Sequence, residues 1–163
     1  MKIAVCPGSF DPVTLGHLDI IERAAQLFDQ VVVLVTSNPQ KQTLFSLDER
    51  AELIRRVTAA IPNVSVDTHD GLLVDYMRDH GAGVIVKGLR AMSDYEYEFQ
   101  MALTNRQLYP QAETVFLTTS LERMYLSSSL VKQIAHFGGD ISALVPAEII
   151  SDVQNKVRKD DLA

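Results

Sequence analysis

Short runs of aliphatic residues alternate along this chain with longer segments whose apolar residues recur at helical spacing. The continuous apolar runs indicate strands covered on both faces, and the periodic segments indicate amphipathic helices. The expected strands span residues 3–6, 31–35, 64–66, 84–86 and 114–117. The expected helices span residues 16–28, 46–61, 72–79, 93–109, 127–137 and 146–157.

Local signals mark several element ends. Ser46 with Glu49, and Ser93 with Glu96, have the spacing of a capping box, so each pair predicts a helix start. Gly88 is expected to stop the fourth strand.

Five strands separated by helices predict an α/β fold, a doubly wound five-stranded parallel sheet with right-handed crossovers. The chain shows no internal repeat or low-complexity linker, so residues 1–163 are expected to form one domain. Ligands of such sheets bind outside the carboxyl ends of the strands, at the topological switch point. The segments expected to carry the chemistry therefore follow the strands, at residues 7–17, 36–41, 68–73, 87–90 and 118–129.

The composition narrows the function classes. With 47% hydrophobic and 22% charged residues, the chain is typical of a globular protein and not of a disordered one. The 21 acidic residues against 15 basic ones give a net charge of −6, which argues against general nucleic-acid or anionic-membrane binding. A small phosphorylated ligand remains compatible, because it responds to local charge.

Cys6 is the single cysteine, which excludes an internal disulfide and a cysteine-based metal cluster. The first apolar run covers residues 3–6 and is too short for a signal sequence or a membrane span. We therefore expect a cytoplasmic protein.

The segment after the first strand carries the most candidate chemistry. Thr14 can cap the following helix, Gly16 allows a ligand close to the backbone, and His17 falls in the first helical turn. A helix N-terminus offers unpaired N–H groups and a positive partial charge, so this segment predicts an anion site. The alternative is an ordinary surface histidine.

Cations follow two other strands. Lys87 and Arg90 flank Gly88, and Lys41 follows the second strand. Glu98 lies in the helix after Arg90. Lys87 and Arg90 could instead form ordinary salt bridges at the strand end. Lys41 could be a solvated loop lysine, and Glu98 an exposed carboxylate of the helix.

Three hydroxyls, Ser127, Ser128 and Ser129, stand at the start of a later helix and resemble a cradle for a triphosphate. Simple capping would need only one of them. Neither a dinucleotide-binding glycine motif nor a phosphate-loop motif is present. No carboxylate cluster resembles a metal cage, although Asp11, Asp67 and Asp70 could each touch a metal, so Mg²⁺ is expected to arrive on substrate phosphates.

These motifs together resemble a known family. Residues 14–17, Thr-Leu-Gly-His, are similar to the (His/Thr)-x-Gly-His signature of the nucleotidyltransferase superfamily, and residues 127–129 resemble its second nucleotide motif. Residues 7–17, with Lys-Gly-Leu-Arg at 87–90 and Tyr-Glu-Tyr-Glu-Phe-Gln at 95–100, resemble the phosphopantetheine adenylyltransferase family in particular. The likeness runs from about residue 2 to residue 146.

The resemblance implies a Rossmann-like nucleotidyltransferase fold. It also implies transfer of the adenylyl group of ATP to 4′-phosphopantetheine, giving dephospho-coenzyme A and pyrophosphate in the penultimate step of coenzyme A biosynthesis. Mg²⁺ would be carried mainly by the ATP phosphates. A homohexamer and feedback by coenzyme A are implied as well. A sister nucleotidyltransferase with another phosphate acceptor and a non-catalytic ATP-sensing module are the competing hypotheses.

Site roles follow from the same resemblance. His17 would stabilise the transition state and Lys41 would share the catalytic role, whereas no residue is expected to be a metal ligand. The implied phosphopantetheine site is Ser9, Lys41, Leu73 and Lys87. The implied ATP site is Ser9, Phe10, His17, Gly88, Leu89, Arg90, Glu98, Arg123, Met124, Tyr125, Leu126, Ser127, Ser128 and Ser129. Ser9, Lys87 and Met124 stand where relatives often carry threonine, arginine and an aromatic residue.

Overall fold

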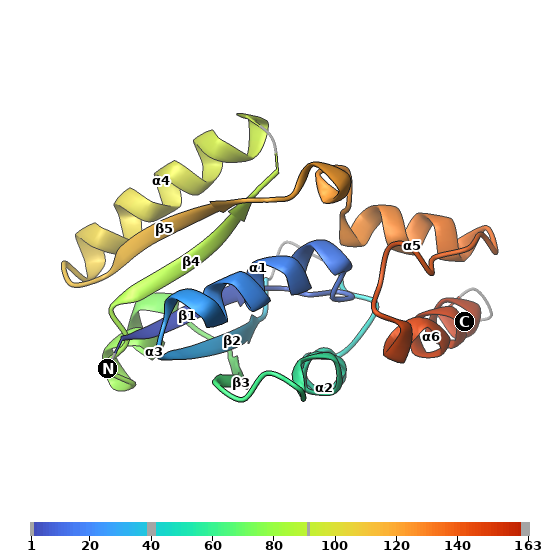
Figure 1. The fold of residues 1–163 in the computed structure, drawn as a ribbon, viewed down its shortest axis with the longest axis horizontal. Coiled ribbons are helices and arrows are strands. Elements are labelled where there is room, and N and C mark those ends of the chain that lie inside the picture. The colour runs from blue at the N-terminus through green and yellow to red at the C-terminus, as the bar shows by residue number, and fades with distance from the viewer. Residues whose placement is uncertain (1, 39–41, 91, 161–163) are drawn as a thin grey trace.

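A five-stranded parallel sheet lies at the centre of the molecule (Figure 1), in a computed structural model that describes residues 2–38, 42–90 and 92–160. The strands are β1 (Ile3–Gly8), β2 (Gln30–Thr36), β3 (Val64–His69), β4 (Val84–Leu89) and β5 (Glu113–Thr118). Their order across the sheet is β3-β2-β1-β4-β5, and every neighbouring pair is parallel. The predicted doubly wound sheet is confirmed, with its switch point between β1 and β4.

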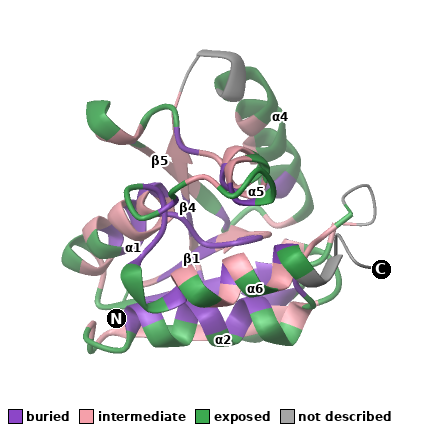
Figure 2. Cartoon of the chain, turned by 90° about the vertical axis from the view of Figure 1, so that its right-hand side faces the viewer, coloured by how far each residue is buried: buried purple, intermediate pink, exposed green. Residues whose placement is uncertain are grey.

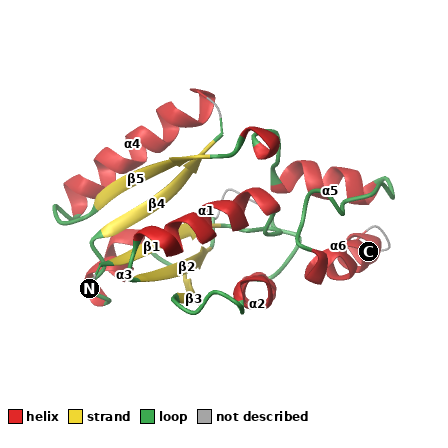
Figure 3. Cartoon of the chain, in the orientation of Figure 1, coloured by secondary structure: helices red, strands yellow, loops and turns green. Residues whose placement is uncertain are grey.

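Helices cover both faces of the sheet (Figure 3). They are α1 (Leu15–Leu27), α2 (Leu47–Thr58), α3 (Leu73–Asp79), α4 (Met92–Leu108), α5 (Ser128–His136) and α6 (Ile150–Asp160), with 3₁₀ turns η1 (Leu121–Arg123) and η2 (Ala147–Ile149). Val5 packs with Tyr76 and Met77 of α3, whereas its neighbours Ala4 and Cys6 pack with α1. The central strand is therefore buried on both faces, as its continuous apolar run predicts.

A second layer of helices extends the core beyond the sheet. Val153 and Val157 of α6 are buried in the same cluster as Leu53 and Val57 of α2. Figure 2 shows α2 and α6 side by side, each with buried and exposed residues alternating along it. The same view shows α4 as largely exposed.

Two local expectations are wrong. Strand β4 continues through Gly88 to Leu89, because Gly88 pairs in register with Leu117 of β5. Glycine here allows close packing and does not end the strand, since a Cβ at Gly88 would lie 2.9 Å from Ile20 Cγ1. Helix α4 begins at Met92, so Ser93 lies inside it and is not its N-cap. The Ser-x-x-Glu spacing is short enough to recur within a helix, whereas the box at Ser46 is confirmed.

Candidate active site

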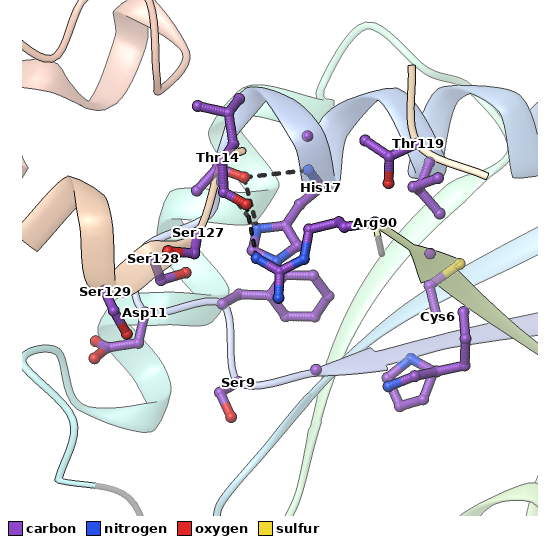
Figure 4. A pocket seen from close by; sticks show the side chains of 18 of the residues that line it. Cys6, Ser9, Asp11, Thr14, His17, Arg90, Thr119, Ser127, Ser128 and Ser129 are labelled. Carbon is purple, nitrogen blue, oxygen red and sulfur yellow. Dashed lines mark hydrogen bonds between the residues drawn. The ribbon is translucent and has the colours of Figure 1, made fainter. Parts of the chain in front are cut away.

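A cavity of about 660 Å³ opens at the carboxyl ends of β1 and β4 (Figure 4). The site residues expected from the sequence that line it are Ser9, Phe10, His17, Lys87, Gly88, Arg90, Glu98, Leu126, Ser127, Ser128 and Ser129. It is also lined by Tyr97 and Lys132, which have no role expected from the sequence, and by Asp11, which is expected only as a possible metal contact. The cavity therefore lies at the switch point, where a doubly wound sheet binds its ligand.

Helix α1 begins at one wall of this cavity with a capping box in which histidine takes the usual place of glutamate. Thr14 Oγ1 accepts the His17 N–H (3.3 Å), and His17 Nδ1 accepts the Thr14 N–H (3.0 Å). Because Nδ1 accepts from the backbone, the proton of the neutral ring lies on Nε2. The cap thus sets both the orientation of the imidazole and the atom that can donate.

The ring of Phe10 packs against the imidazole of His17. Its ring meets the His17 ring edge-on, with centroids 5.1 Å apart, and its side chain is buried. Its backbone has φ of 49°, the left-handed region that residues with a Cβ seldom adopt. Gly8 permits this fold-back, since a Cβ there would lie 2.9 Å from the Phe10 ring. Phe10 is therefore part of the cavity wall and not only a candidate contact of the nucleotide.

Arg50 of α2 is a buried positive charge that holds two strand-end loops together. Its Nη1 donates to the carbonyl of Ser9 (2.6 Å) and to that of Thr36 (3.0 Å), and its Nε donates to the carbonyl of Ser46 (3.3 Å). Burial lowers the pKa of Arg50, and the nearby charge of Asp11 opposes that change. No sequence signal singles out Arg50: it lies in the first turn of α2, directly after the capping box of Ser46 and Glu49, and that motif explains the helix start without giving Arg50 a role.

Asp11 is a second buried charge, and three donors occupy its carboxylate. Oδ1 accepts the Phe45 N–H (2.9 Å), while Oδ2 accepts the Leu44 N–H (2.9 Å) and Lys132 Nζ (2.9 Å). The first loop, the segment before α2 and helix α5 therefore meet at one side chain. The sequence predicts Asp11 as a possible metal contact; in the structure its carboxylate accepts these three hydrogen bonds.

The serines at the start of α5 differ from one another. Ser127 Oγ accepts the Leu130 N–H (3.1 Å) and is the N-cap, whereas Ser128 Oγ donates to the carbonyl of Pro12 (2.8 Å). These two hydroxyls hold the helix start in place. The three serines nevertheless lie together along the cavity, as Figure 4 shows.

The cations at the carboxyl end of β4, Lys87 within the strand and Arg90 directly after it, already have protein partners. Lys87 Nζ lies 3.3 Å from Glu98 Oε1, so the expected acceptor-site cation and the expected ATP-site carboxylate form an ion pair. Arg90 Nη1 donates to the carbonyl of Leu126 (2.8 Å) and so joins the end of β4 to the segment before α5. Both cations still line the cavity.

Five of the expected site residues do not line the cavity: Leu73, Leu89, Arg123, Met124 and Tyr125. Arg123 Nη1 donates to the carbonyl of Leu15 (3.1 Å) and lies 3.5 Å from Asp19 Oδ1, so it binds η1 to α1. Met124 and Tyr125 are exposed on the loop beyond η1. Lys41, to which a catalytic role is attributed by resemblance, lies outside the described residues.

The thiol of Cys6 is buried at the floor of the cavity. Burial raises the pKa of Cys6 to about 12, although the positive charge of Lys87 opposes the shift. The thiol therefore stays protonated near neutral pH and is a poor nucleophile.

The described ranges contain no group of three or more His, Cys, Asp or Glu side chains placed to hold a metal ion. Asp11, a buried carboxylate of the cavity, already accepts from three donors. The donor set thus fits a metal carried by a bound ligand better than a resident protein-held one. Across the same ranges, no helix has the length and apolar character to cross a membrane.

Comparison with a solved structure supports the fold. The described chain is similar to the crystal structure of a putative nicotinate-nucleotide adenylyltransferase from Vibrio parahaemolyticus, with a TM-score of 0.67 and 19% sequence identity. The superposition covers 99% of this chain and 95% of that one. At this identity the likeness concerns the nucleotidyltransferase fold alone.

Sequence comparisons are more specific. The cytidylyltransferase-like family model matches residues 5–134. A phosphopantetheine adenylyltransferase from Clostridium tetani is 59% identical, covering 96% of this chain and 98% of its own length. One from Caldanaerobacter subterraneus is 56% identical over 98% and 99% of the two chains, and one from Thermotoga neapolitana is 52% identical over 96% and 98%. With identity above half over nearly the whole length, and the signature residues gathered at one cavity, this chain belongs to the phosphopantetheine adenylyltransferase family.

Proposed function

We propose that this protein transfers the adenylyl group of ATP to 4′-phosphopantetheine, giving dephospho-coenzyme A and pyrophosphate. This is the penultimate step of coenzyme A biosynthesis. The observation that carries the proposal is the meeting of His17, the serine-rich start of α5 and the cations at the carboxyl end of β4 in one cavity. The relatives described above bear the name of this activity.

The reaction needs alignment more than it needs a nucleophile from the protein. A phosphate oxygen of the acceptor attacks the α-phosphorus of ATP, the bond to the β-phosphate oxygen breaks, and pyrophosphate leaves. The attacking phosphate is already an anion, so the protein must hold two mutually repelling anions in line and neutralise the charge that develops. The protonated thiol of Cys6 agrees with a direct transfer, because it provides no nucleophile for a covalent intermediate.

His17 supplies a donor for the developing charge. Its Nδ1 is taken by the Thr14 N–H, which leaves the proton on Nε2 to donate to an α-phosphate oxygen. A neutral imidazole can do this without acting as an acid or base. The start of α5 adds backbone N–H groups and a positive helix end for the phosphates that leave.

We divide the binding residues between the two substrates as follows, including the five that do not line the cavity and Lys41, which lies outside the described residues. Ser9, Phe10, Gly88, Arg90, Glu98 and the segment 123–129 would bind ATP, with Leu89 beside them. Ser9, Lys41, Leu73 and Lys87 would bind phosphopantetheine. The ammonium group of Lys87 cannot donate in the bidentate manner of an arginine, so it would attract the acceptor phosphate without fixing the orientation of that phosphate.

Mg²⁺ belongs to this proposal as a companion of ATP. The buried carboxylate of Asp11 already accepts three hydrogen bonds, so we expect the ion to enter on the ATP phosphates and to retain most of its water ligands. It would supply charge neutralisation on the triphosphate.

Two further proposals concern assembly and regulation. Helix α4 exposes large apolar side chains, among them Tyr97, Phe99 and Leu103, so we propose it as a contact in a homohexamer. Sedimentation of wild type and Leu103→Asp measures this: the variant should shift to smaller species. Coenzyme A, which contains both halves of the product, would compete in the same cavity as a feedback ligand.

A pyrophosphate-release assay separates the candidate functions. Release should require ATP and 4′-phosphopantetheine together. Release with nicotinamide mononucleotide in place of phosphopantetheine would favour a sister nucleotidyltransferase instead. Binding of ATP without release in any combination would favour a non-catalytic ATP-sensing module.

A further inference from the structure

Asp11 joins three segments that are far apart in the sequence. Its carboxylate accepts the N–H groups of Leu44 and Phe45, ahead of α2, and the ammonium of Lys132 on α5, each at 2.9 Å. Its own backbone belongs to the loop between β1 and α1. The residue is only 4% exposed, so its carboxylate is largely shielded from water.

The charge of Asp11 is unexpected where it stands. A carboxylate in the wall of a cavity built for phosphates would repel them if its oxygens faced the ligand. Both oxygens are instead bonded to the protein, and Lys132 balances the charge from the same wall. The arrangement is therefore suited to holding the wall in place and not to contacting the substrate.

Phe10, which precedes Asp11, has a backbone conformation that the surrounding structure must hold in place. Phe10 has φ of 49°, a conformation that is unfavourable for an L-residue and that persists only where the surroundings enforce it. The Phe10 ring packs edge-on against His17. Asp11, next in the chain, is anchored at three points, so it limits the freedom of the Phe10 backbone and of the ring that supports the imidazole.

We propose that Asp11 is a positioning residue for the transfer: it clamps the β1–α1 loop, the segment before α2 and helix α5 into one wall, and so keeps His17 aligned. The inference rests on the proposed adenylyl transfer. It differs from a general stabilising role because it predicts a loss of alignment in the bound complex and not only a loss of folded protein.

The test is Asp11→Asn, which keeps the size of the side chain. An amide has one acceptor oxygen and a donor nitrogen, so it cannot serve both N–H groups and Lys132 together. We expect kcat to fall at least tenfold at 20 °C, while the KM values and the ATP dissociation constant change less than threefold. Active-site concentration is set by ATP titration, so that a loss of folded protein does not lower the measured kcat.

Two controls complete the experiment. Asp140→Asn makes the same chemical change at an exposed aspartate whose carboxylate accepts the N–H and the hydroxyl of Ser142, and it should leave kcat unchanged. Lys132→Met removes the counter-charge but keeps both backbone bonds of Asp11, so its loss in kcat should be smaller than that of Asp11→Asn.

The outcomes separate this inference from the function on which it rests. A wild type that releases no pyrophosphate from ATP and phosphopantetheine overturns both. If the wild type is active and the kcat of Asp11→Asn lies within threefold of the wild-type value, only the positioning role is overturned. An equal loss in Lys132→Met and Asp11→Asn also overturns it, since Asp11 would then act through the ion pair alone.

Discussion

The Thr14 N–H donates to Nδ1 of His17 across 3.0 Å, so the cap of α1 also determines which nitrogen of the imidazole carries the proton. Thr14 Oγ1 accepts the His17 N–H in return, which completes the capping box. A structural motif and a candidate catalytic group are thus one arrangement. The ring is held before any substrate arrives, which is the preorganisation that charge stabilisation in a transition state requires.

Replacing Arg50 by Met should destabilise the fold. The change leaves the carbonyl groups of Ser9 and Thr36 without their buried charged donor, which costs about 2–3 kcal/mol. Urea unfolding measures the loss. Arg55→Met, at an exposed arginine of the same helix, is the control and should cost much less. Equal effects of the two substitutions would show that Arg50 does not bridge the loops.

The Lys87–Glu98 ion pair gives two substitutions with opposite effects. Glu98→Gln removes the charge that competes with a phosphate for Lys87, so the KM for phosphopantetheine should fall about two- to fivefold at low ionic strength. Lys87→Gln should raise it. Steady-state kinetics at two salt concentrations measure both, and the effect of Glu98→Gln should shrink at high salt. A rise in the phosphopantetheine KM in both variants would contradict this account.

Gly88→Ala should disturb α1. The new Cβ would lie 2.9 Å from Ile20 Cγ1, one turn beyond His17 on the same helix, and overpacking of this kind costs about 1–3 kcal/mol. Both thermal stability and kcat should fall. The double variant Gly88→Ala/Ile20→Ala removes the clash and should recover part of kcat. If the double variant is no better than Gly88→Ala, the contact with Ile20 is not the cause.

The pH dependence of the unfolding free energy should show the contribution of the Glu49 carboxylate. Hydrogen bonds from Lys156 and the Ser46 N–H lower the pKa of Glu49 below its usual 4.5. A carboxyl whose pKa is depressed by folding stabilises the protein above its unfolded pKa, and that stabilisation is lost as the pH falls through the folded value. The difference in unfolding free energy between wild type and Glu49→Gln should therefore be largest near pH 7 and shrink below pH 4.5.

Urea unfolding at pH 7 and near pH 3 measures this difference. Glu52→Gln, an exposed partner of Arg55, is the control and should show a smaller change between the two pH values. A Glu49→Gln difference that is constant across this range would refute the assignment.

Local pattern predicted the sheet, its two covered faces and most of the cavity. Short motifs sufficed for the first turn of α1 and for the start of α5, because capping and anion binding depend on neighbouring residues. The partners of Arg50 and Asp11 could not be predicted, since their bonds join segments more than thirty residues apart in most cases. The expectation that Arg123 lines the cavity was wrong for a related reason. Its side chain donates to the carbonyl of Leu15 in α1, and the local motif does not predict that direction.

The most direct test of the central claim compares wild type and His17→Ala with ATP and 4′-phosphopantetheine, both saturating, with pyrophosphate and dephospho-coenzyme A measured in the same samples. Loss of one transition-state donor lowers turnover by about 10²–10³. We therefore predict equimolar products from the wild type and at least that loss of kcat in His17→Ala, with ATP still bound. Near-normal turnover in His17→Ala, or pyrophosphate without dephospho-coenzyme A from the wild type, would contradict the account.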